Sequence, residues 1–319
     1  MGKKTSISVV IPVCNERQTL EPLYRQVREV LAANKLAGEI IFVDDGSSDG
    51  SWEIIKTLAR RDKRVAAISF RRNFGKAAAL TAGFARAGGG IIITMDGDLQ
   101  DDPAEIPRFI EKLGEGFDLV SGWKQSRQDP LSKTVPSRLF NWATARTSGV
   151  RLHDFNCGFK AYRAAVLREV SIYGELHRYI PVLAHQRGYR IAEIAVRHHP
   201  RVTGRSKYGW GRLVKGYLDL LTVVFLTRYG RRPGHFFGTV GSVAFGVGLL
   251  INIYLTLVKL VGHQAIGQRP LLLLGTLLMI LGIQFVSIGL LGEMIAARTR
   301  PEQDYSIAET TEGPGDGKH

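Results

Sequence analysis

The chain has 319 residues, of which 45% are hydrophobic, and its formal net charge is +14 at pH 7. That length can hold one α/β domain of about 200 residues together with a smaller unit. Residues 234–258 and 271–292 contain no charged side chain. Each stretch exceeds the roughly 18 apolar residues that indicate a membrane-spanning helix, so the composition argues against a chain that is soluble throughout and favours two transmembrane helices over two buried core helices.

Basic residues flank the outer ends of these two stretches. The positive-inside rule places such ends in the cytoplasm, so both termini and the polar N-terminal part are predicted to be cytoplasmic parts of an integral membrane protein. A basic surface beside the membrane favours anionic lipid headgroups or an anionic lipid substrate over nucleic acid, for which no recognition motif is present. The flanking residues are Arg228, Arg231 and Arg232 before the first stretch and Arg298 and Arg300 after the second, against Lys259 and Arg269 in the connecting loop.

Strand and helix patterns alternate along the first third of the chain. The alternation predicts an α/β fold with a mostly parallel sheet and helices on both faces. Ligands of such sheets bind beyond the carboxyl ends of the strands, so Asp44, Asn73 and Asp96, which fall at strand ends, are expected to share one pocket. Strands are predicted at 7–12, 39–43, 65–70 and 91–95, and helices at 16–33, 52–60 and 77–87, the second of them capped by Ser48 or Asp49.

An acidic turn follows the last of these strands. Asp96 and Asp98 present hard oxygen ligands, which suit Mg²⁺ or Mn²⁺ and leave positions for the oxygens of a diphosphate. If the segment stays extended, Asp96, Asp98 and Gln100 point to one side and can bind one ion, with Asp98 as the first ligand. The alternative is a solvated acidic turn. Asp101 and Asp102 are expected to begin the next helix, ahead of Pro103.

The nucleotide-binding motifs of Rossmann domains and P-loops are absent, because neither G-x-G-x-x-G after the first strand nor G-x-x-x-x-G-K-[ST] occurs. Five segments instead resemble the family-2 glycosyltransferases with a GT-A fold. The similarity is greatest to enzymes that transfer a sugar from a nucleotide to a polyprenyl phosphate, namely dolichol-phosphate mannosyltransferases and two-span bactoprenol glucosyltransferases. The segments are ISVVIPVCNE (7–16), VDDGSSDGS (43–51), RRNFGKAAAL (71–80), MDGDLQDDP (95–103) and DFNCGFKAYR (154–163).

This resemblance implies roles for individual residues. Asp44 matches the nucleobase-binding acid, although its alternative role is to cap a turn. Asp96 and Asp154 are the implied catalytic residues, and Asp154 acts either as a general base or in positioning, because a phosphate acceptor is largely deprotonated at neutral pH. Cys157 replaces the hydroxyl residue that is usual in that motif. The implied nucleotide-binding set is Pro12, Glu16, Asp44, Asn73 and Lys76.

An anionic acceptor requires cations. The loop at 201–208 resembles the family's R-x-x-G-x-S-K-Y pattern, in which Arg205 and Lys207 are the candidate ligands of the lipid phosphate. Ser137 and Arg138 form a second candidate pair. The alternative for both is a solvated basic loop that prefers anionic headgroups.

These observations give a predicted domain order. A GT-A catalytic domain spans 1–208, an amphipathic juxtamembrane segment spans 209–232, two transmembrane helices lie within 233–297, and a disordered cytoplasmic tail spans 298–319. Residues 139–145 are a second candidate for a helix at the membrane interface, with a core helix as the alternative.

By the same resemblance, the expected reaction is metal-dependent, inverting transfer of a sugar to a polyprenyl phosphate such as undecaprenyl phosphate. The expected place is the cytoplasmic face of a bacterial inner membrane, and the expected assembly is a homo-tetramer. UDP-glucose is the favoured donor, while GDP-mannose, UDP-hexosamine and aminoarabinose donors stay open. A processive polysaccharide synthase is disfavoured because Q-x-x-R-W is absent. A non-catalytic membrane assembly subunit is the remaining alternative.

Overall fold

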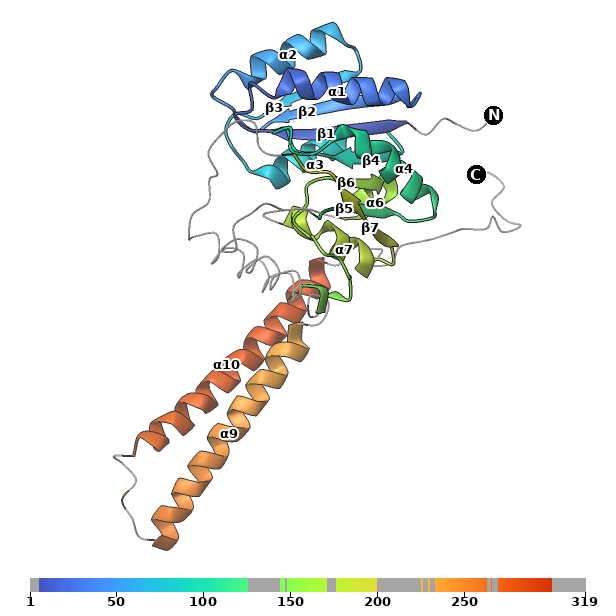
Figure 1. The fold of residues 1–319 in the computed structure, drawn as a ribbon. Coiled ribbons are helices and arrows are strands. Elements are labelled where there is room, and N and C mark those ends of the chain that lie inside the picture. The colour runs from blue at the N-terminus through green and yellow to red at the C-terminus, as the bar shows by residue number, and fades with distance from the viewer. Residues whose placement is uncertain are drawn as a thin grey trace, which may run out of the picture. The chain divides into compact units, whose positions relative to one another are not determined.

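The computed structural model describes residues 6–125, 144–146, 148–170, 176–199, 225, 229, 233–262, 265 and 269–299. The chain divides into two compact units, Met1–Val223 and Val224–His319. The first unit is an α/β domain and the second contains two long helices (Figure 1).

A sheet of seven strands forms the centre of the first unit, in the order β3-β2-β1-β4-β6-β5-β7. The neighbours β3, β2, β1 and β4 are parallel, and β5 is parallel to β7. Only β6 runs antiparallel to the strands on both of its sides. The prediction of a mostly parallel sheet is therefore confirmed. The strands are β1 (Ile7–Val13), β2 (Gly38–Asp44), β3 (Val65–Ser69), β4 (Ile91–Thr94), β5 (Leu119–Lys124), β6 (Lys160–Arg163) and β7 (Ile191–Val196).

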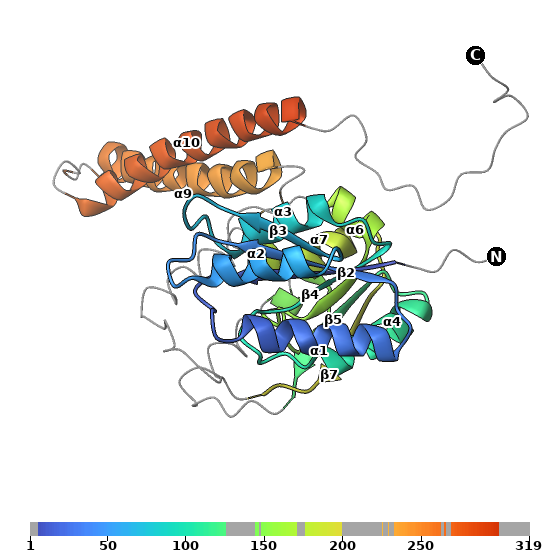
Figure 2. The same cartoon turned by 90° about the horizontal axis from the view of Figure 1, so that it is seen from above.

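Helices cover both faces of this sheet (Figure 2). Successive side chains of β1 point to opposite faces of the sheet. Val9 and Ile11 pack with α1, α2 and α4 on one face, whereas Val10 packs with α3 on the other. A Cβ on Gly83 would lie 2.3 Å from Val10 Cγ1, so α3 approaches the sheet closely only because this position is glycine. The helices are α1 (Leu20–Ala33), α2 (Ser51–Arg61), α3 (Lys76–Arg86), α4 (Ile106–Gly114), α6 (Ala164–Glu169) and α7 (Ile180–Gln186), with short 3-10 helices η1 (Pro103–Glu105) and η2 (Leu176–Tyr179).

Two helix starts differ from the prediction. Helix α1 begins at Leu20 instead of residue 16, because the Thr19 hydroxyl bonds to the backbone oxygens of Glu16 and Gly97 and holds this stretch in a turn. The N-cap of α2 is Gly50, with φ of 88°, and not Ser48 or Asp49. Asp49 instead accepts hydrogen bonds from the backbone N–H groups of Arg17 (3.0 Å) and Ser51 (2.9 Å). Asp49 therefore joins the loop after β2 to the loop after β1.

The second unit contains α9 (Pro233–Gly262) and α10 (Pro270–Thr299), each 30 residues long. Both helices are long and apolar enough to cross a membrane, with mean hydropathies of 1.9 and 2.4. They extend beyond the predicted spans at 234–258 and 271–292. Of the predicted interface segment 139–145 only residues 144 and 145 are described, and of the juxtamembrane segment 209–232 only residues 225 and 229. The predicted boundary at 208 and the tail from residue 300 fall outside the described residues.

Glycines repeat every seven residues along the contact between α9 and α10. A Cβ on Gly241 would lie 2.6 Å from the Gly282 carbonyl oxygen, and one on Gly248 would lie 2.5 Å from that of Gly275. The two backbones therefore touch at these pairs. Such contacts through small residues are expected of membrane helices, because the hydrophobic effect does not drive helices together within lipid. A Cβ on Gly238 meets nothing within 4 Å.

We expect Gly241→Ile and Gly248→Ile each to destabilise the helix pair, because overpacking a close contact costs about 1–3 kcal/mol. Thermal unfolding of the full-length protein in detergent measures the effect. Gly238→Ile is the matched control, since it adds the same side chain to the same helix in open space. Equal destabilisation by the control would contradict the assigned contact.

Candidate active site

The loops after β1 and β2 are joined at the carboxyl edge of the sheet. Asn15 adopts φ of 59°, and its side-chain oxygen accepts from Ser48 N at 2.8 Å. Backbone N–H groups of this loop donate in return, from Asn15 to Ser47 Oγ (2.9 Å) and from Glu16 to Ser51 Oγ (3.0 Å). The two loops therefore form one rigid rim.

Two adjacent aspartates connect this rim to the loop after β3. Asp44 is 1% exposed, and its carboxylate accepts from Ser69 Oγ (3.1 Å) and Ser47 N (3.3 Å). Asp45 accepts from the N–H groups of Phe74 (2.7 Å) and Gly75 (3.0 Å) and so fixes the segment that carries Asn73. Sequence reasoning missed Asp45, although its place in an Asp-Asp pair at a strand end could have indicated it.

The other predicted nucleotide-binding residues lie at the same edge. Asn73 Nδ2 donates to Cys14 Sγ at 3.2 Å, which brings the β3 loop against the β1 loop. A Cβ on Gly97 would lie 3.5 Å from the Pro12 carbonyl oxygen and 3.8 Å from Glu16 Cγ. The structure thus brings the predicted nucleotide side and the acidic turn together.

The acidic turn does not continue the strand. β4 ends at Thr94, and Leu99 adopts φ of 60°. The expectation that Asp96, Asp98 and Gln100 lie on one side of an extended segment is therefore wrong. Asp98 Oδ1 accepts from Gln100 N at 3.2 Å, while Gln100 Nε2 donates to the His199 carbonyl at 3.4 Å.

Asp96 is already paired with a cation. Its carboxylate contacts the ammonium of Lys76, the first residue of α3. Gly158 lies against the same carboxylate, because a Cβ there would be 2.9 Å from both oxygens. Within the described residues, no group of three or more His, Cys, Asp or Glu side chains forms a ready metal site. The hard oxygens of Asp96 and Asp98, with the Lys76 ammonium at Asp96, fit a divalent cation that also binds phosphate.

Asp101 has a role that differs from the predicted one. Asp102 does begin the next helical segment, since its side chain accepts from Ala104 N at 2.9 Å. Asp101 is instead 2% exposed; it accepts from Asp96 N at 3.1 Å and lies 3.4 Å from Lys124 Nζ. Burial raises the pKa of Asp101, but the Lys124 ammonium and His198 outweigh burial and hold that pKa well below its ordinary value.

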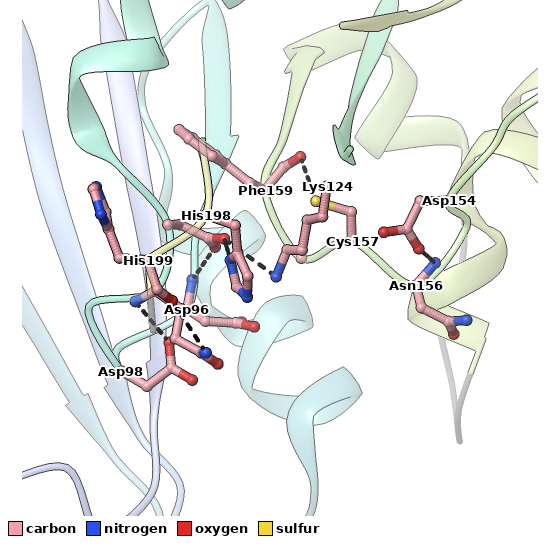
Figure 3. Close-up of polar contacts among 12 residues, drawn as sticks. Asp96, Asp98, Lys124, Asp154, Asn156, Cys157, Phe159, His198 and His199 are labelled. Carbon is pink, nitrogen blue, oxygen red and sulfur yellow. Dashed lines mark hydrogen bonds and ion pairs between the residues drawn. The ribbon is translucent and has the colours of Figure 1, made fainter. Parts of the chain in front are cut away.

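Lys124 was not predicted from the sequence. It is the last residue of β5, and its side chain is 13% exposed. Burial lowers the pKa of Lys124, but the Asp101 carboxylate outweighs burial and keeps it above the ordinary value, so the pair is ionised at neutral pH. Figure 3 shows this side chain between the Asp96 turn and the loop of Asp154. A lysine as the one charged residue of its strand was the available signal.

The loop of Asp154 forms the other side of the site. Asp154 is 2% exposed, and its Oδ1 accepts from Asn156 N at 3.1 Å. Cys157 is buried and its thiol donates to the Phe159 carbonyl at 3.7 Å. Burial raises the pKa of Cys157 to about 12, so the thiol stays neutral and substitutes weakly for the usual hydroxyl. Ser137, Arg138, Arg205 and Lys207 lie outside the described residues.

The chain was compared with known proteins. The glycosyl transferase family 2 model matches residues 8–171, which is more than half of the chain. The chain belongs to glycosyl transferase family 2. It is therefore a glycosyltransferase, and the predicted family, fold and enzyme class are confirmed.

Full-length relatives of this family 2 member are also found. It is 41% identical over 305 residues to the dodecaprenyl-phosphate galacturonate synthase of Rhizobium johnstonii, covering 94% of this chain and 90% of that protein. It is 37% identical over 302 residues to the undecaprenyl-phosphate 4-deoxy-4-formamido-L-arabinose transferase of Salmonella choleraesuis, covering 92% and 91%. Glucosyl-3-phosphoglycerate synthase of Mycobacterium tuberculosis, solved with Mn²⁺ and UDP, has a similar fold (TM-score 0.54, 21% identity, 70% and 78% coverage).

We expect Lys124→Met to lower the free energy of unfolding by about 3–5 kcal/mol, because it leaves the buried Asp101 carboxylate without its cation. Lys124→Met combined with Asp101→Asn removes both charges and should recover part of the loss. Denaturant unfolding in detergent, followed by tryptophan fluorescence, measures both variants. Lys56→Met on the surface of α2 is the control, expected within about 0.5 kcal/mol. A double variant as unstable as Lys124→Met would contradict the pairing.

Proposed function

We propose that the protein transfers a sugar from a nucleotide diphosphate to a polyprenyl phosphate, with inversion, at the cytoplasmic face of a bacterial inner membrane. The carrying observation is the juxtaposition of the Asp96 turn, the Lys76 ammonium and the Asp154 loop at one edge of the sheet. Relatives that align over more than nine-tenths of the chain are named for sugar transfer to polyprenyl phosphates, and α9 and α10 supply a membrane anchor.

The donor side is built for a diphosphate. Asp96 and Asp98 would hold Mg²⁺ or Mn²⁺, which when bound neutralises charge on the departing diphosphate. Lys76 lies at the start of α3 beside Asp96, where its ammonium would bind oxygens of the donor diphosphate. Asp44, Asn73, Pro12 and Glu16 would surround the nucleoside.

The acceptor side needs little general-base catalysis. A phosphate monoester with a second pKa near 6 is largely dianionic at neutral pH. An oxygen of the lipid phosphate can therefore attack C1 of the sugar directly, while the bond from C1 to the diphosphate oxygen breaks and the nucleoside diphosphate leaves. Asp154 then orients the acceptor or sugar, or takes the last proton. Ser137, Arg138, Arg205 and Lys207 are proposed to bind the lipid phosphate, and the homo-tetramer stays a prediction.

The sugar is proposed to be galacturonate carried by UDP. The sequence analysis favoured glucose, but the two relatives are named for galacturonate and for 4-deoxy-4-formamido-L-arabinose. The relative of higher identity is the galacturonate synthase, so galacturonate takes the first place and the formamido sugar is the second candidate.

The test is transfer of radiolabelled sugar from UDP-galacturonate, UDP-4-deoxy-4-formamido-L-arabinose, UDP-glucose and GDP-mannose to undecaprenyl phosphate by purified protein in detergent. We expect labelled lipid from UDP-galacturonate with Mn²⁺ or Mg²⁺ and none with EDTA. If label is transferred from another donor instead, that donor's sugar replaces galacturonate in the proposal. Transfer in the presence of EDTA would contradict the dependence on a metal ion. Failure with every donor would overturn the proposed reaction.

In the same assay, Asp98→Asn should lower the rate by about 100-fold or more, because losing metal-held charge at the diphosphate removes several kcal/mol of transition-state stabilisation. Glu111→Gln, an exposed change on α4, is the control and should retain the rate. An Asp98→Asn variant with normal turnover would contradict the metal assignment.

A further inference from the structure

A carboxylate on the edge strand holds the beginning of the Asp154 loop. Glu193 is the third residue of β7, paired in register with Ser121 of β5, and its side chain is 11% exposed. Its Oε1 accepts from the backbone N–H groups of His153 (3.0 Å) and Asp154 (3.1 Å). Its Oε2 contacts His153 Nδ1 at 2.8 Å. An anion that binds successive backbone N–H groups makes strong, charge-assisted hydrogen bonds.

A cation holds the other end of the same loop. Lys160, the first residue of β6, is 3% exposed, and its ammonium donates to the carbonyl oxygens of Phe155 (3.3 Å) and Cys157. Glu193 accepts hydrogen bonds from backbone N–H groups of the loop, and Lys160 donates to its carbonyl oxygens. The backbone from 153 to 157 is therefore clamped between two side chains of opposite charge.

An aromatic pair lies against the clamp. The His153 ring stacks on Trp123 of β5, with ring centroids 4.2 Å apart and an interplanar angle of 16°. The stacked imidazole contacts the Glu193 carboxylate, and the Glu193 side chain is only 11% exposed. Hydrogen bonds to the carboxylate are strengthened when water is excluded.

The far end of the loop touches the acidic turn. Gly158 lies so close to Asp96 that even a Cβ would crowd both carboxylate oxygens. A displacement of the loop at residues 153 and 154 therefore changes the distance between Asp154 and Asp96. Sugar transfer depends on that distance, since the donor and acceptor must meet between these residues.

We propose that Glu193 is a positioning residue for sugar transfer, which fixes Asp154 relative to Asp96 through the N–H groups of residues 153 and 154. The inference rests on the proposed function, because it needs Asp154 to act in transfer. Glu193 contacts the loop backbone from the strand behind it, and its effect reaches the substrates through Asp154.

The first test is Glu193→Gln, which replaces one acceptor oxygen by an NH₂ group facing an N–H donor. We expect kcat to fall about 10- to 100-fold, as a misplaced catalytic group does, while KM for the UDP-sugar stays within about twofold, because the donor loops are unchanged. Glu193→Asp keeps the charge on a shorter side chain and should recover part of kcat. If Glu193→Gln does not fold, the kcat of Glu193→Asp tests the proposal in its place, with a fall in kcat expected because the shorter side chain reaches the N–H groups less well.

Glu39→Gln is the matched control. Glu39 also accepts from a loop backbone N–H, that of Gly88 at 2.8 Å, and from Ser8 Oγ at 2.6 Å. It lies near the start of β2, at the opposite edge of the sheet from the site. The change should leave kcat within about twofold. An equal loss of kcat in this control would show that a general loss of stability explains the Glu193 result.

The second test is a double-mutant cycle with Asp154→Asn. If Glu193 acts through Asp154, Glu193→Gln lowers the residual rate of Asp154→Asn by less than twofold, although it lowers the wild-type rate at least tenfold. Equal fold losses in both backgrounds, or an unchanged kcat in Glu193→Gln, would overturn the positioning role. In both cases wild-type transfer remains, so the result is distinct from a failure of the proposed function, in which the wild type transfers no sugar to undecaprenyl phosphate.

Discussion

Negative charge is concentrated at the carboxyl edge of the sheet, and the catalytic unit is organised around holding it there. Clustered carboxylates repel one another and resist burial unless hydrogen bonds or cations offset the cost. Here Asp45 is held by two backbone N–H groups, Asp96 by Lys76, and Asp101 by Lys124 and the Asp96 N–H. The groups that balance the charge also join the loops, so the site's shape and its electrostatic balance depend on the same interactions.

The reversed direction of β6 explains how the two sides of the site meet. A parallel strand delivers the residues that follow it to the carboxyl edge, as β4 does with Asp96. An antiparallel strand delivers the residues that precede it, so β6 brings the Asp154 loop to that same edge. Because β5 is antiparallel to β6, it again ends at this edge and presents Lys124. One strand reversal therefore brings the Asp154 loop to the site without a further domain.

Glycine allows close contact in both units, for different physical reasons. Gly158 lets the Asp154 loop approach the Asp96 carboxylate, because a Cβ there would lie 2.9 Å from both carboxylate oxygens. In the helix pair, Gly241 and Gly248 let α9 touch the carbonyl oxygens of α10. Lipid provides no hydrophobic drive for helices to associate, so short-range packing between backbones has to hold them together.

The sequence predicted the parts of the site that follow from local order. Asp44, Asn73 and Asp96 each end or follow a strand in a repeated strand–helix pattern, and the rule for parallel sheets places such residues together. The segment around Asp98 was wrongly predicted to be extended, because the positive φ of Leu99 cannot be inferred from the pattern of side chains along the sequence. Lys124, Glu193 and the buried role of Asp101 depend on the placement of β5, β6 and β7 next to one another, which is a long-range property of the fold.

Glu193 is the clearest case, since it lies 39 residues from Asp154 along the chain and in a strand whose pattern favours only a half-buried position. A carboxylate in such a strand is ordinarily a solvated side chain. Only the loop that packs on β7 makes Glu193 an acceptor for the backbone N–H groups of residues 153 and 154.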